Sequence, residues 1–397
     1  MMKSAVAVSY ELDDPLGCAQ ELAASVRERL VFEKNSIGFL LCDADCDGAA
    51  LTGELKKILG IEVAGMTSLA ALDKEGRQEA AVVLMVLTAG DCFFSPAVSA
   101  PLGEGDAAGK ITGAYKASAA AAAGYGEKAA LIFAFCPLGM PFSGDIYPEI
   151  FSGASGNVPV IGGICSDDYD YARARTFLSG GEYRDALVMV SVWGNVKPVF
   201  SLRHVTSKFA ERTRRVSSAR GNVVKRVGDE TFVEYLKSFG LNTDIEEAAL
   251  SFTSYPVMLT REGQDETPLM RHILSLNKED GSGSFFGDVP EGTLANVCLV
   301  NKKDITASCG ESMQYLLEEA GKQGGYEYSS IFCFSCCGRA MILGADSNAE
   351  GSIIRDLIPP GLALAGSYCL GEICPVKYRG GEAVNRFHNC SITFCML

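Results

Sequence analysis

This sequence is short of several features that mark secreted, membrane-spanning and hydrolytic proteins. Only three of its 397 residues are histidine. Its longest apolar run, residues 80–90, is far below the roughly 20 residues that a membrane-spanning helix needs. The first residues hold no apolar signal-peptide core, because acidic residues follow almost at once. We therefore expect a soluble protein of the cytoplasm, without membrane insertion.

Positive charge is also scarce. The 35 lysines and arginines are outnumbered by 49 acidic residues, which gives a net charge of −14 and a pI of about 4.8. A surface this acidic repels phosphate backbones and anionic lipids, so we expect no nucleic-acid partner. Residues 207–228 are the exception, with seven basic residues. We interpret them as a solvated face of strands and turns, with a patch for an anion or acidic partner as the alternative.

Cysteine is abundant, but its pattern excludes a disulfide framework. The chain has fifteen cysteines, an odd number, and they are scattered along its whole length. Small secreted proteins usually show an even number in a short chain. A chain this long buries enough apolar surface without cross-links. We therefore expect reduced thiols, most of them packed as small apolar side chains.

The order of elements predicts an α/β fold in two domains, with mixed, largely antiparallel sheets and helices on the outer faces. Gly, Asn and Asp turns separate many neighbouring strands, and no glycine loop for phosphate joins a strand to a helix. We place the domains at 1–222 and 223–397, and see no fixed-period repeat. Capping residues and apolar periodicity predict the helices, and short apolar runs predict the strands. The predicted helices are 14–30, 47–60, 110–126, 229–240, 312–325 and 348–357, and the main strands are 36–45, 61–72, 80–90, 128–137, 329–336 and 391–397.

Residues 331–344 place two adjacent thiols and an arginine between apolar runs, which leaves three interpretations open. Arg339 would stabilise a thiolate at Cys336 or Cys337, although a hydrolytic thiol usually also needs a histidine. Cys333 and Cys336 have the spacing of half a zinc site, but in a strand they lie on opposite faces. We therefore expect no metal ligands and no cofactor.

The third interpretation is a pocket for a small charged ligand. Arg339 offers a fork that suits a carboxylate, Glu372 accepts from an ammonium, and Asn389 can do both. Together with Ser335, Cys336 and His388 they would hold both ends of an amino acid or a small carboxylate. The alternative is that Arg339 and Glu372 only satisfy each other as a buried pair.

The first half adds a turn that suits the other side of such a pocket. Gly162 and Gly163 allow close backbone approach, and Asp167 follows them. Turn formation is the simpler reason for an acidic residue at this place.

The ordered set "FSCCGR", "GSYCLGEICP" and "RFHNCSITF" resembles the C-terminal signature of FIST proteins. "VPVIGGICSDD" is similar to the glycine and acidic turn of the N-terminal FIST domain, so the resemblance covers nearly the whole chain. One segment departs from it, because "AGMTSLAAL" stands where a polar turn is expected.

The resemblance implies a sensory, signal-input protein that binds a small ligand, an amino acid being the expected class. It implies no enzymatic activity, and FIST domains of bacteria occur alone or joined to signalling outputs. This chain would signal through a partner protein. The alternative that the residues leave open is a thiol-dependent enzyme or redox sensor using Cys336 or Cys337.

Overall fold

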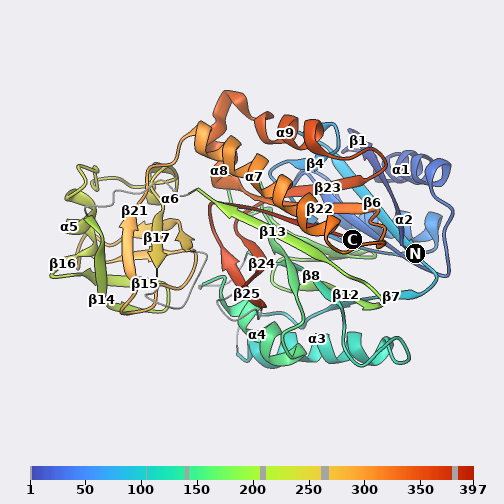
Figure 1. The fold of residues 1–397 in the computed structure, drawn as a ribbon, viewed down its shortest axis with the longest axis horizontal. Coiled ribbons are helices and arrows are strands. Elements are labelled where there is room, and N and C mark those ends of the chain that lie inside the picture. Colours follow the sequence, from blue (N-terminus) through green and yellow to red (C-terminus); the bar gives the residue numbers. More distant parts are fainter. Residues whose placement is uncertain (1, 104, 139–142, 206–211, 261–267, 378–382) are drawn as a thin grey trace.

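A computed structural model describes residues 2–103, 105–138, 143–205, 212–260, 268–377 and 383–397. The described chain forms a large body and a smaller β-rich part that stands to one side of it in Figure 1. We call residues 212–300 the β insert, and the rest of the described chain the body. Both ends of the chain lie in the body (Figure 1).

The body is built from three units with the same order of elements. Each unit has a strand, a helix, a second strand, one or more further helices, a third strand, a hairpin and a last strand. The first unit comprises β1 (Lys3–Ser9), α1 (Pro15–Arg29), β2 (Asn35–Cys42), α2 (Gly48–Leu59), β3 (Glu62–Thr67), β4 (Ala71–Asp73), β5 (Gly76–Gln78) and β6 (Val82–Ala89). The sequence did not reveal this repetition.

The second and third units follow the first along the chain. The second comprises β7 (Cys92–Val98), α3 (Ala107–Ala121), β8 (Leu131–Cys136), α4 (Ile146–Ser155), β9 (Val160–Ile164), β10 (Thr176–Leu178), β11 (Gly181–Tyr183) and β12 (Val188–Gly194). The third comprises β13 (Val199–His204), α7 (Lys302–Gly321), β22 (Ser330–Cys336), α8 (Cys337–Leu343), the 3-10 turn η2 (Gly344–Asp346), α9 (Ala349–Leu357), β23 (Ala363–Cys369), β24 (Glu372–Lys377), β25 (Ala383–His388) and β26 (Ser391–Met396).

Each unit gives its hairpin to the sheet of another unit. The three six-stranded sheets run β1-β6-β2-β3-β10-β11, β25-β24-β9-β8-β12-β7 and β13-β26-β22-β23-β4-β5. In every sheet the second and third strands of the unit pair in parallel, and the other pairs are antiparallel. The three units are therefore interlocked, and the mixed, largely antiparallel α/β fold is confirmed.

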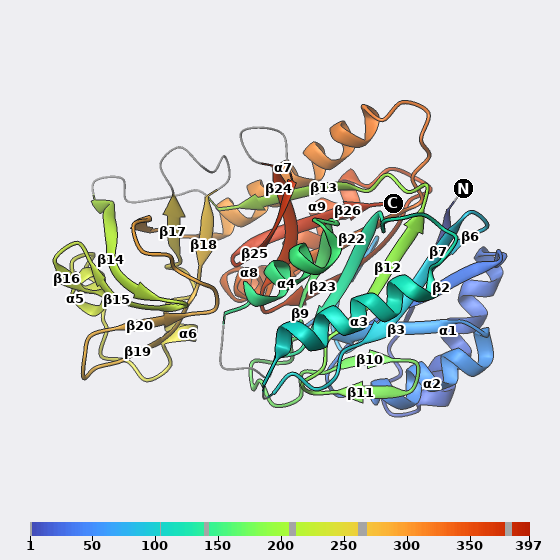
Figure 2. The same cartoon turned by 90° about the horizontal axis from the view of Figure 1, so that it is seen from below.

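The three sheets meet at a common apolar centre. Phe39, Phe133 and Phe332 occupy matched places on β2, β8 and β22, and their ring centroids lie 4.6–5.0 Å apart. The helices cover the outside, with α1 and α2, α3 and α4, and α7 and α9 on three different sides (Figures 1 and 2). Buried apolar side chains lie on both sides of the three sheets, so the central strands are apolar on both faces.

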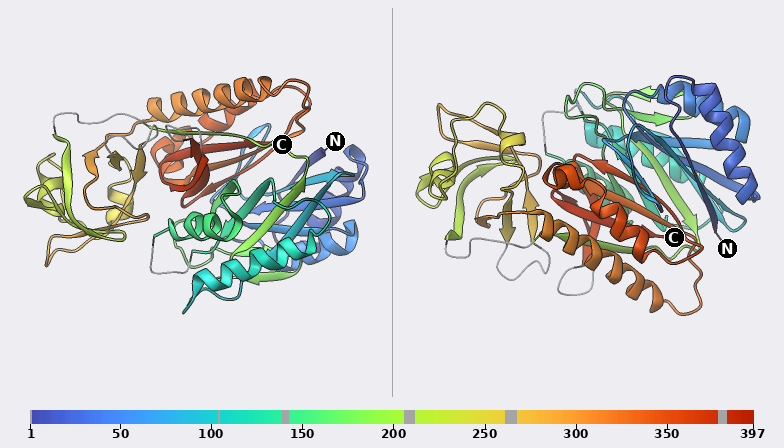
Figure 3. Two further views of the ribbon diagram at one scale, coloured as in Figure 1. Left: turned by 60° about the horizontal axis from the view of Figure 1, so that its bottom comes forward. Right: turned by 90° about the horizontal axis from the view of Figure 1, so that it is seen from above.

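The β insert enters the third unit between β13 and α7. It comprises β14 (Arg214–Arg220), β15 (Val223–Val227), β16 (Glu230–Thr231), α5 (Phe232–Lys237), α6 (Ala248–Ser251), β17 (Val257–Thr260), β18 (Leu269–Arg271), β19 (Ile273–Leu276), β20 (Gly283–Phe285) and β21 (Leu294–Val297). Its strands pair only with one another, and Figure 3 shows it beside the body from two further sides. Much of the predicted basic segment 207–228 forms β14 and β15; residues 207–211 lie outside the described residues.

Several local predictions hold, with shifts at the ends of elements. Asp14 and Asp47 cap α1 and α2, as the sequence indicated. The helix expected from 312 begins ten residues earlier at Lys302, capped by Asn301. Thr231 caps α5 in place of the expected Asp229, because its hydroxyl and Glu234 form a capping box.

The two halves of the sequence are closely interleaved. Residue 222 lies in the turn between β14 and β15, and β13 pairs with β26 from the end of the chain. The division at residue 222 stays a prediction. Within the described ranges, no helix is both long and apolar enough to cross a membrane.

Candidate functional site

The polar residues predicted in the last third of the chain come from neighbouring ends of the third unit's elements. Ser335 and Cys336 end β22, and Arg339 lies in α8. Glu372 begins β24, while His388 ends β25 directly opposite it. All five side chains are almost completely buried.

Arg339 forms its ion pair with Glu350 and not with Glu372. Its Nη2 and Nε lie 2.7 and 3.0 Å from Glu350 Oε1, and Nη2 also donates to Ser308 Oγ at 3.0 Å. Ser335 Oγ and the Tyr368 hydroxyl each donate to Glu350 Oε2 at 3.0 Å. Glu350 was missed in the sequence, because its place near the start of α9 gives no hint of a partner 11 residues earlier.

Glu372 has only neutral hydrogen-bond partners among the described residues. Ser391 Oγ donates to its Oε2 at 2.5 Å, and the Cys369 thiol lies 3.5 Å from its Oε1. Burial raises the pKa of this carboxyl from 4.5 to about 8, although its hydrogen bonds and the positive charge of Arg339 oppose the shift. Glu372 is therefore mostly protonated at neutral pH. No cation is hydrogen-bonded to it in the described chain, so a ligand cation or hydrogen-bond acceptor could bind this carboxyl.

Some buried polar atoms of the predicted residues, and one of the β insert, are unsatisfied. Asn389 Nδ2 and His272 Nε2 are buried without a hydrogen-bond partner in the described chain, as is Arg339 Nη1. Asn389 Oδ1 accepts from the His272 backbone N–H at 3.4 Å, which joins the body to the β insert. Buried polar groups are normally paired, so these atoms indicate a site that water or a ligand completes.

A thiol and an imidazole also meet here. Cys336 Sγ lies 3.9 Å from His272 Nδ1, a contact that sequence spacing gave no means of finding. Burial raises the pKa of Cys336 well above its usual value and lowers that of His272 to about 4. Both groups are therefore neutral, and the pair is not a thiolate and imidazolium.

The residues predicted in the first half reach the same place. Gly163 pairs with Glu372 and Gly162 with Ile373, so β9 lies directly beside β24. A Cβ on Gly162 would lie 1.9 Å from the Ala134 carbonyl oxygen, so the close approach requires glycine here. Asp167 instead accepts from the backbone N–H groups of Tyr171 and Arg173, both at 3.0 Å, and so organises its own loop.

A narrow cavity lies where this cluster meets the β insert. We call it the interface pocket; its volume is about 30 Å³. Its lining residues are Tyr169, Tyr171, Ala249, Leu250, Thr253, His272, Phe286, Cys336, Cys337, Gly338, Met341 and Leu370. The pocket therefore takes one wall from α6 and β18–β20 and the other from the body.

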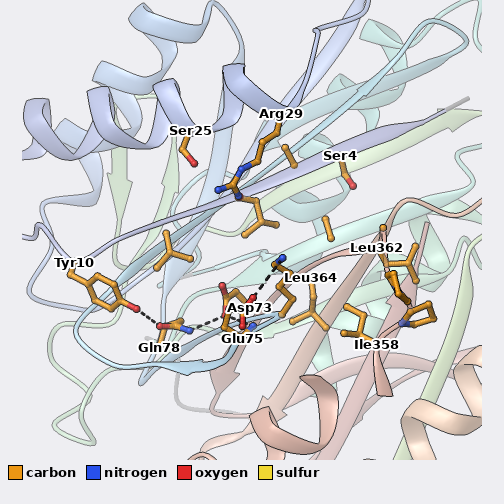
Figure 4. A pocket seen from close by; sticks show the side chains of 18 residues that line it. Ser4, Tyr10, Ser25, Arg29, Asp73, Glu75, Gln78, Ile358, Leu362 and Leu364 are labelled. Carbon is orange, nitrogen blue, oxygen red and sulfur yellow. Dashed lines mark hydrogen bonds and ion pairs between the residues drawn. The ribbon is translucent and has the colours of Figure 1, made fainter. Parts of the chain in front are cut away.

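A wider groove of about 710 Å³ lies elsewhere, between β1, α1 and the segment before β23. Figure 4 shows Arg29, Asp73 and Leu364 among the side chains that line it. None of the predicted site residues lines this groove. The smaller interface pocket is lined by the predicted residue Cys336 and by His272, whose Nε2 is unsatisfied, and we therefore place the candidate site there.

A buried ion pair holds the β insert on the body. Arg271 Nη2 lies 2.8 and 3.0 Å from the two carboxylate oxygens of Asp145, and its Nη1 donates to the Phe387 carbonyl at 3.0 Å. The Asp288 backbone N–H donates to the same carboxylate at 2.7 Å. Because one charge without the other would be buried unpaired, this contact favours the docked arrangement.

The thiols give no sign of a metal site. All fifteen cysteines are free and buried. No group of three or more His, Cys, Asp or Glu in the described ranges is placed to hold a metal ion. The spacing of Cys333 and Cys336 thus belongs to a buried strand in which every residue is packed.

Comparisons with known proteins identify two domains. Residues 36–230 match the FIST N domain, and residues 230–375 match the FIST C domain. No curated protein matches the chain. One solved structure, described as "Cyanuric acid hydrolase: evolutionary innovation by structural concatenation", is 12% identical, with a TM-score of 0.32, and the match covers 76% of this chain and 100% of that one. A TM-score this low supports no conclusion about fold or function.

Proposed function

Because the chain belongs to the FIST family, with a FIST N and a FIST C domain, we propose that it is a cytoplasmic sensory protein. It binds a small ligand at the interface pocket and acts through a partner protein. FIST domains are associated with sensory binding of small ligands in signalling. The fifteen free, buried thiols are those expected of a reducing compartment.

The observation that carries this proposal is the buried carboxyl of Glu372. No cation is hydrogen-bonded to it in the described chain, and Asn389 Nδ2 and His272 Nε2 are buried and unsatisfied. Arg339 and Glu350 show the contrasting case, in which a buried charge is matched by its opposite. A site left polar and unpaired in a well-packed body is typical of ligand binding.

The roles of the predicted residues follow from their contacts. Glu372 would face the amine of an amino acid, and Asn389 would orient the ligand. Only Nη1 of Arg339 remains for a ligand carboxylate, because Glu350 and Ser308 occupy the other side of the guanidinium. Gly163 lets β9 come close to Glu372, and Ser335 acts indirectly by holding Glu350.

Ligand binding would be read through the β insert. His272 lies between the insert and the body, and the Asp145–Arg271 pair joins the same two parts. A ligand that contacts both sides of the pocket stabilises one arrangement of the insert over others. A partner that binds the insert or the adjacent body would respond to that arrangement.

The proposal is tested by thermal unfolding of the purified protein with a panel of amino acids and small carboxylates. A ligand at 100 times its Kd stabilises the folded protein by about 2.7 kcal/mol. We expect a rise in Tm for the wild type that is absent in Glu372→Gln and retained in Thr176→Val, a matched change in the second unit. If no compound raises the Tm while Glu372→Gln folds normally, the proposed site is wrong.

A second function is favoured by one contact, that of Cys336 with His272. In this alternative a movement of the β insert would admit water, charge the pair and make the protein a thiol enzyme or redox sensor. The rate of alkylation by iodoacetamide against pH distinguishes the two functions. Rapid alkylation below pH 8 that persists in the control variant Cys337→Ser assigns a reactive thiol to Cys336 and supports thiol chemistry. Inert thiols exclude it.

A further inference from the structure

The interface pocket has aromatic walls and no basic side chain. Tyr169 and Tyr171 line it from the body and Phe286 from the β insert, and its described lining includes no lysine or arginine. Aromatic faces carry a partial negative charge that attracts cations. Besides burial, the negative charge of Glu372 raises the pKa of the Cys336 and Cys337 thiols, which line the same pocket, so this carboxyl lies close behind the wall. The pocket therefore suits a cation and disfavours an anion.

Building on the sensory function proposed above, we propose that the group recognised in this pocket is a primary ammonium. It sits against Tyr169 and Tyr171 with Glu372 as its counter-charge, and the ligand needs no carboxylate. This separates amines as a class from amino acids. Arg339, the residue expected to bind a carboxylate, is largely occupied by Glu350.

The two tyrosines are held in place at an energetic cost. Their φ angles are 73° and 62°, in the left-handed region that side chains other than glycine rarely adopt. Asp167 holds this loop through the backbone N–H groups of Tyr171 and Arg173, and the Tyr169 hydroxyl donates to the Cys337 carbonyl at 3.2 Å. Strain that the surrounding structure maintains at a pocket wall is evidence that the ring positions matter.

The size of the cavity selects among cations. Its volume of about 30 Å³ exceeds the roughly 10–15 Å³ that a cavity needs to hold one water molecule. A primary ammonium head fits this space, whereas a trimethylammonium head is several times larger. The rest of the ligand needs room that opens when Tyr171, which is 38% exposed, moves aside.

Binding of an ammonium should also release a proton from Glu372. The groups that face this carboxyl are His388 across the strand pair, Arg339 and the thiols of Cys333, Cys336, Cys337, Cys369, Cys374 and Cys390. Arg339 is held by Glu350, and burial keeps His388 and the thiols neutral. A protonated Glu372 that meets an ammonium therefore ionises, and its proton passes to the buffer while the ammonium keeps its own.

Calorimetric titration at pH 7 in phosphate and in MOPS, neither of which is a primary amine, tests this assignment, because the difference in heat between the two buffers reports proton release. The probes are n-butylamine, butyltrimethylammonium, butyrate and norleucine. We expect n-butylamine to bind with release of up to one proton and the next two probes not to bind. Tyr171→Leu should weaken n-butylamine binding about two- to thirtyfold, Tyr169→Phe less, and Glu372→Gln should abolish proton release.

The outcomes separate this proposal from the sensory function. If butyrate or butyltrimethylammonium binds as well as n-butylamine, or if n-butylamine releases no proton, the ammonium assignment is wrong. If norleucine alone binds, and loses binding in Glu372→Gln, the sensory site stands and the amine class is wrong. If no probe binds and a wider amino-acid panel leaves the Tm unchanged, while Glu372→Gln is folded, both proposals fail.

Discussion

The third unit of the body differs from the other two at positions that the fold makes equivalent. Glu372 of the third unit pairs with Gly163. The equivalent positions in the other two sheets are Thr176, which pairs with Met66, and Ala71, which pairs with Ser367. Near the start of the last strand of each unit, the third unit has Ser391, whereas the second has Ala186 and the first has Ala81 at the equivalent position. The Thr176 hydroxyl donates to the Ala186 carbonyl at 2.8 Å, whereas Glu372 is hydrogen-bonded to no charged group among the described residues.

The features that build the fold are shared by all three units. A Cβ on Gly65, Gly162 or Gly366 would lie 1.9, 1.9 or 2.8 Å from a carbonyl oxygen of the neighbouring strand. These glycines stand beside the three central phenylalanines and allow the strands to approach. The packing of glycines and phenylalanines is therefore repeated in all three units. In contrast, unsatisfied buried atoms of His272, Arg339, His388 and Asn389 belong to the third unit and the β insert.

The largest effect is expected from breaking the buried ion pair between Arg339 and Glu350 in the third unit. Arg339→Met should lower the free energy of unfolding by about 3–5 kcal/mol, because it leaves Glu350 buried without a counter-charge. Urea unfolding measures this. Lys302→Met removes the exposed pair with Asp346 and should cost at most about 1 kcal/mol. Equal effects of the two changes would contradict the assignment.

A smaller effect is expected from loosening the β insert. Asp145→Asn removes the counter-charge of Arg271 but keeps an oxygen that accepts from its guanidinium, so it should cost about 1–3 kcal/mol. Amide hydrogen exchange should then speed up at β18 and at the loop 167–173, while β2 and β8 keep their protection. Asp244→Asn, at an exposed pair with Lys278, is the control. Unchanged exchange at the interface would show that the ion pair does not hold the insert.

The pH dependence of stability sharpens the comparison at Glu372 itself. Its pKa rises from 4.5 in the unfolded chain to about 8 in the folded protein, so the folded protein binds more protons between these values. Its contribution is complete below pH 4.5 and is lost as the pH rises through about 8. Glu372→Gln should therefore flatten the decline in the free energy of unfolding between pH 4.5 and about 8. A decline of the same steepness in the variant would exclude Glu372 as its cause.

The smallest effect is expected at the matched position of the second unit. Thr176→Val removes the hydrogen bond to the Ala186 carbonyl while keeping the shape of the side chain. We expect a loss of about 1 kcal/mol in urea unfolding, no change in its pH dependence and no change in ligand binding. If Thr176→Val alters ligand binding, the site is not confined to the interface pocket and Glu372.

The local parts of the fold were predictable from the sequence, and its long-range parts were not. Asp14 and Asp47 cap helices within their own segments, so the sequence reveals them. The exchange of hairpins joins Ala71 to Ser367 and Glu372 to Gly163, and no local pattern records such pairings. The three units also escaped notice because they share strand order and glycine positions but few residue types.

The candidate site shows the same limit. Arg339, Glu372 and Asn389 stood out as polar residues among apolar ones, and all three are buried close to one another. The partner of Arg339 was missed because Glu350 lies on a separate helix. His272 was missed as a neighbour of Cys336 because it lies in the β insert, 64 residues earlier in the chain.

The central claim is that Glu372 is a buried, uncompensated carboxyl that a ligand completes. Infrared difference spectroscopy at pH 7 measures its protonation directly, because a neutral carboxyl and a carboxylate absorb at different frequencies. The account predicts a neutral-carboxyl band in the free protein that is absent from Glu372→Gln and is replaced by a carboxylate band when n-butylamine binds. A Glu372 that is ionised in the free protein at pH 7 would contradict it.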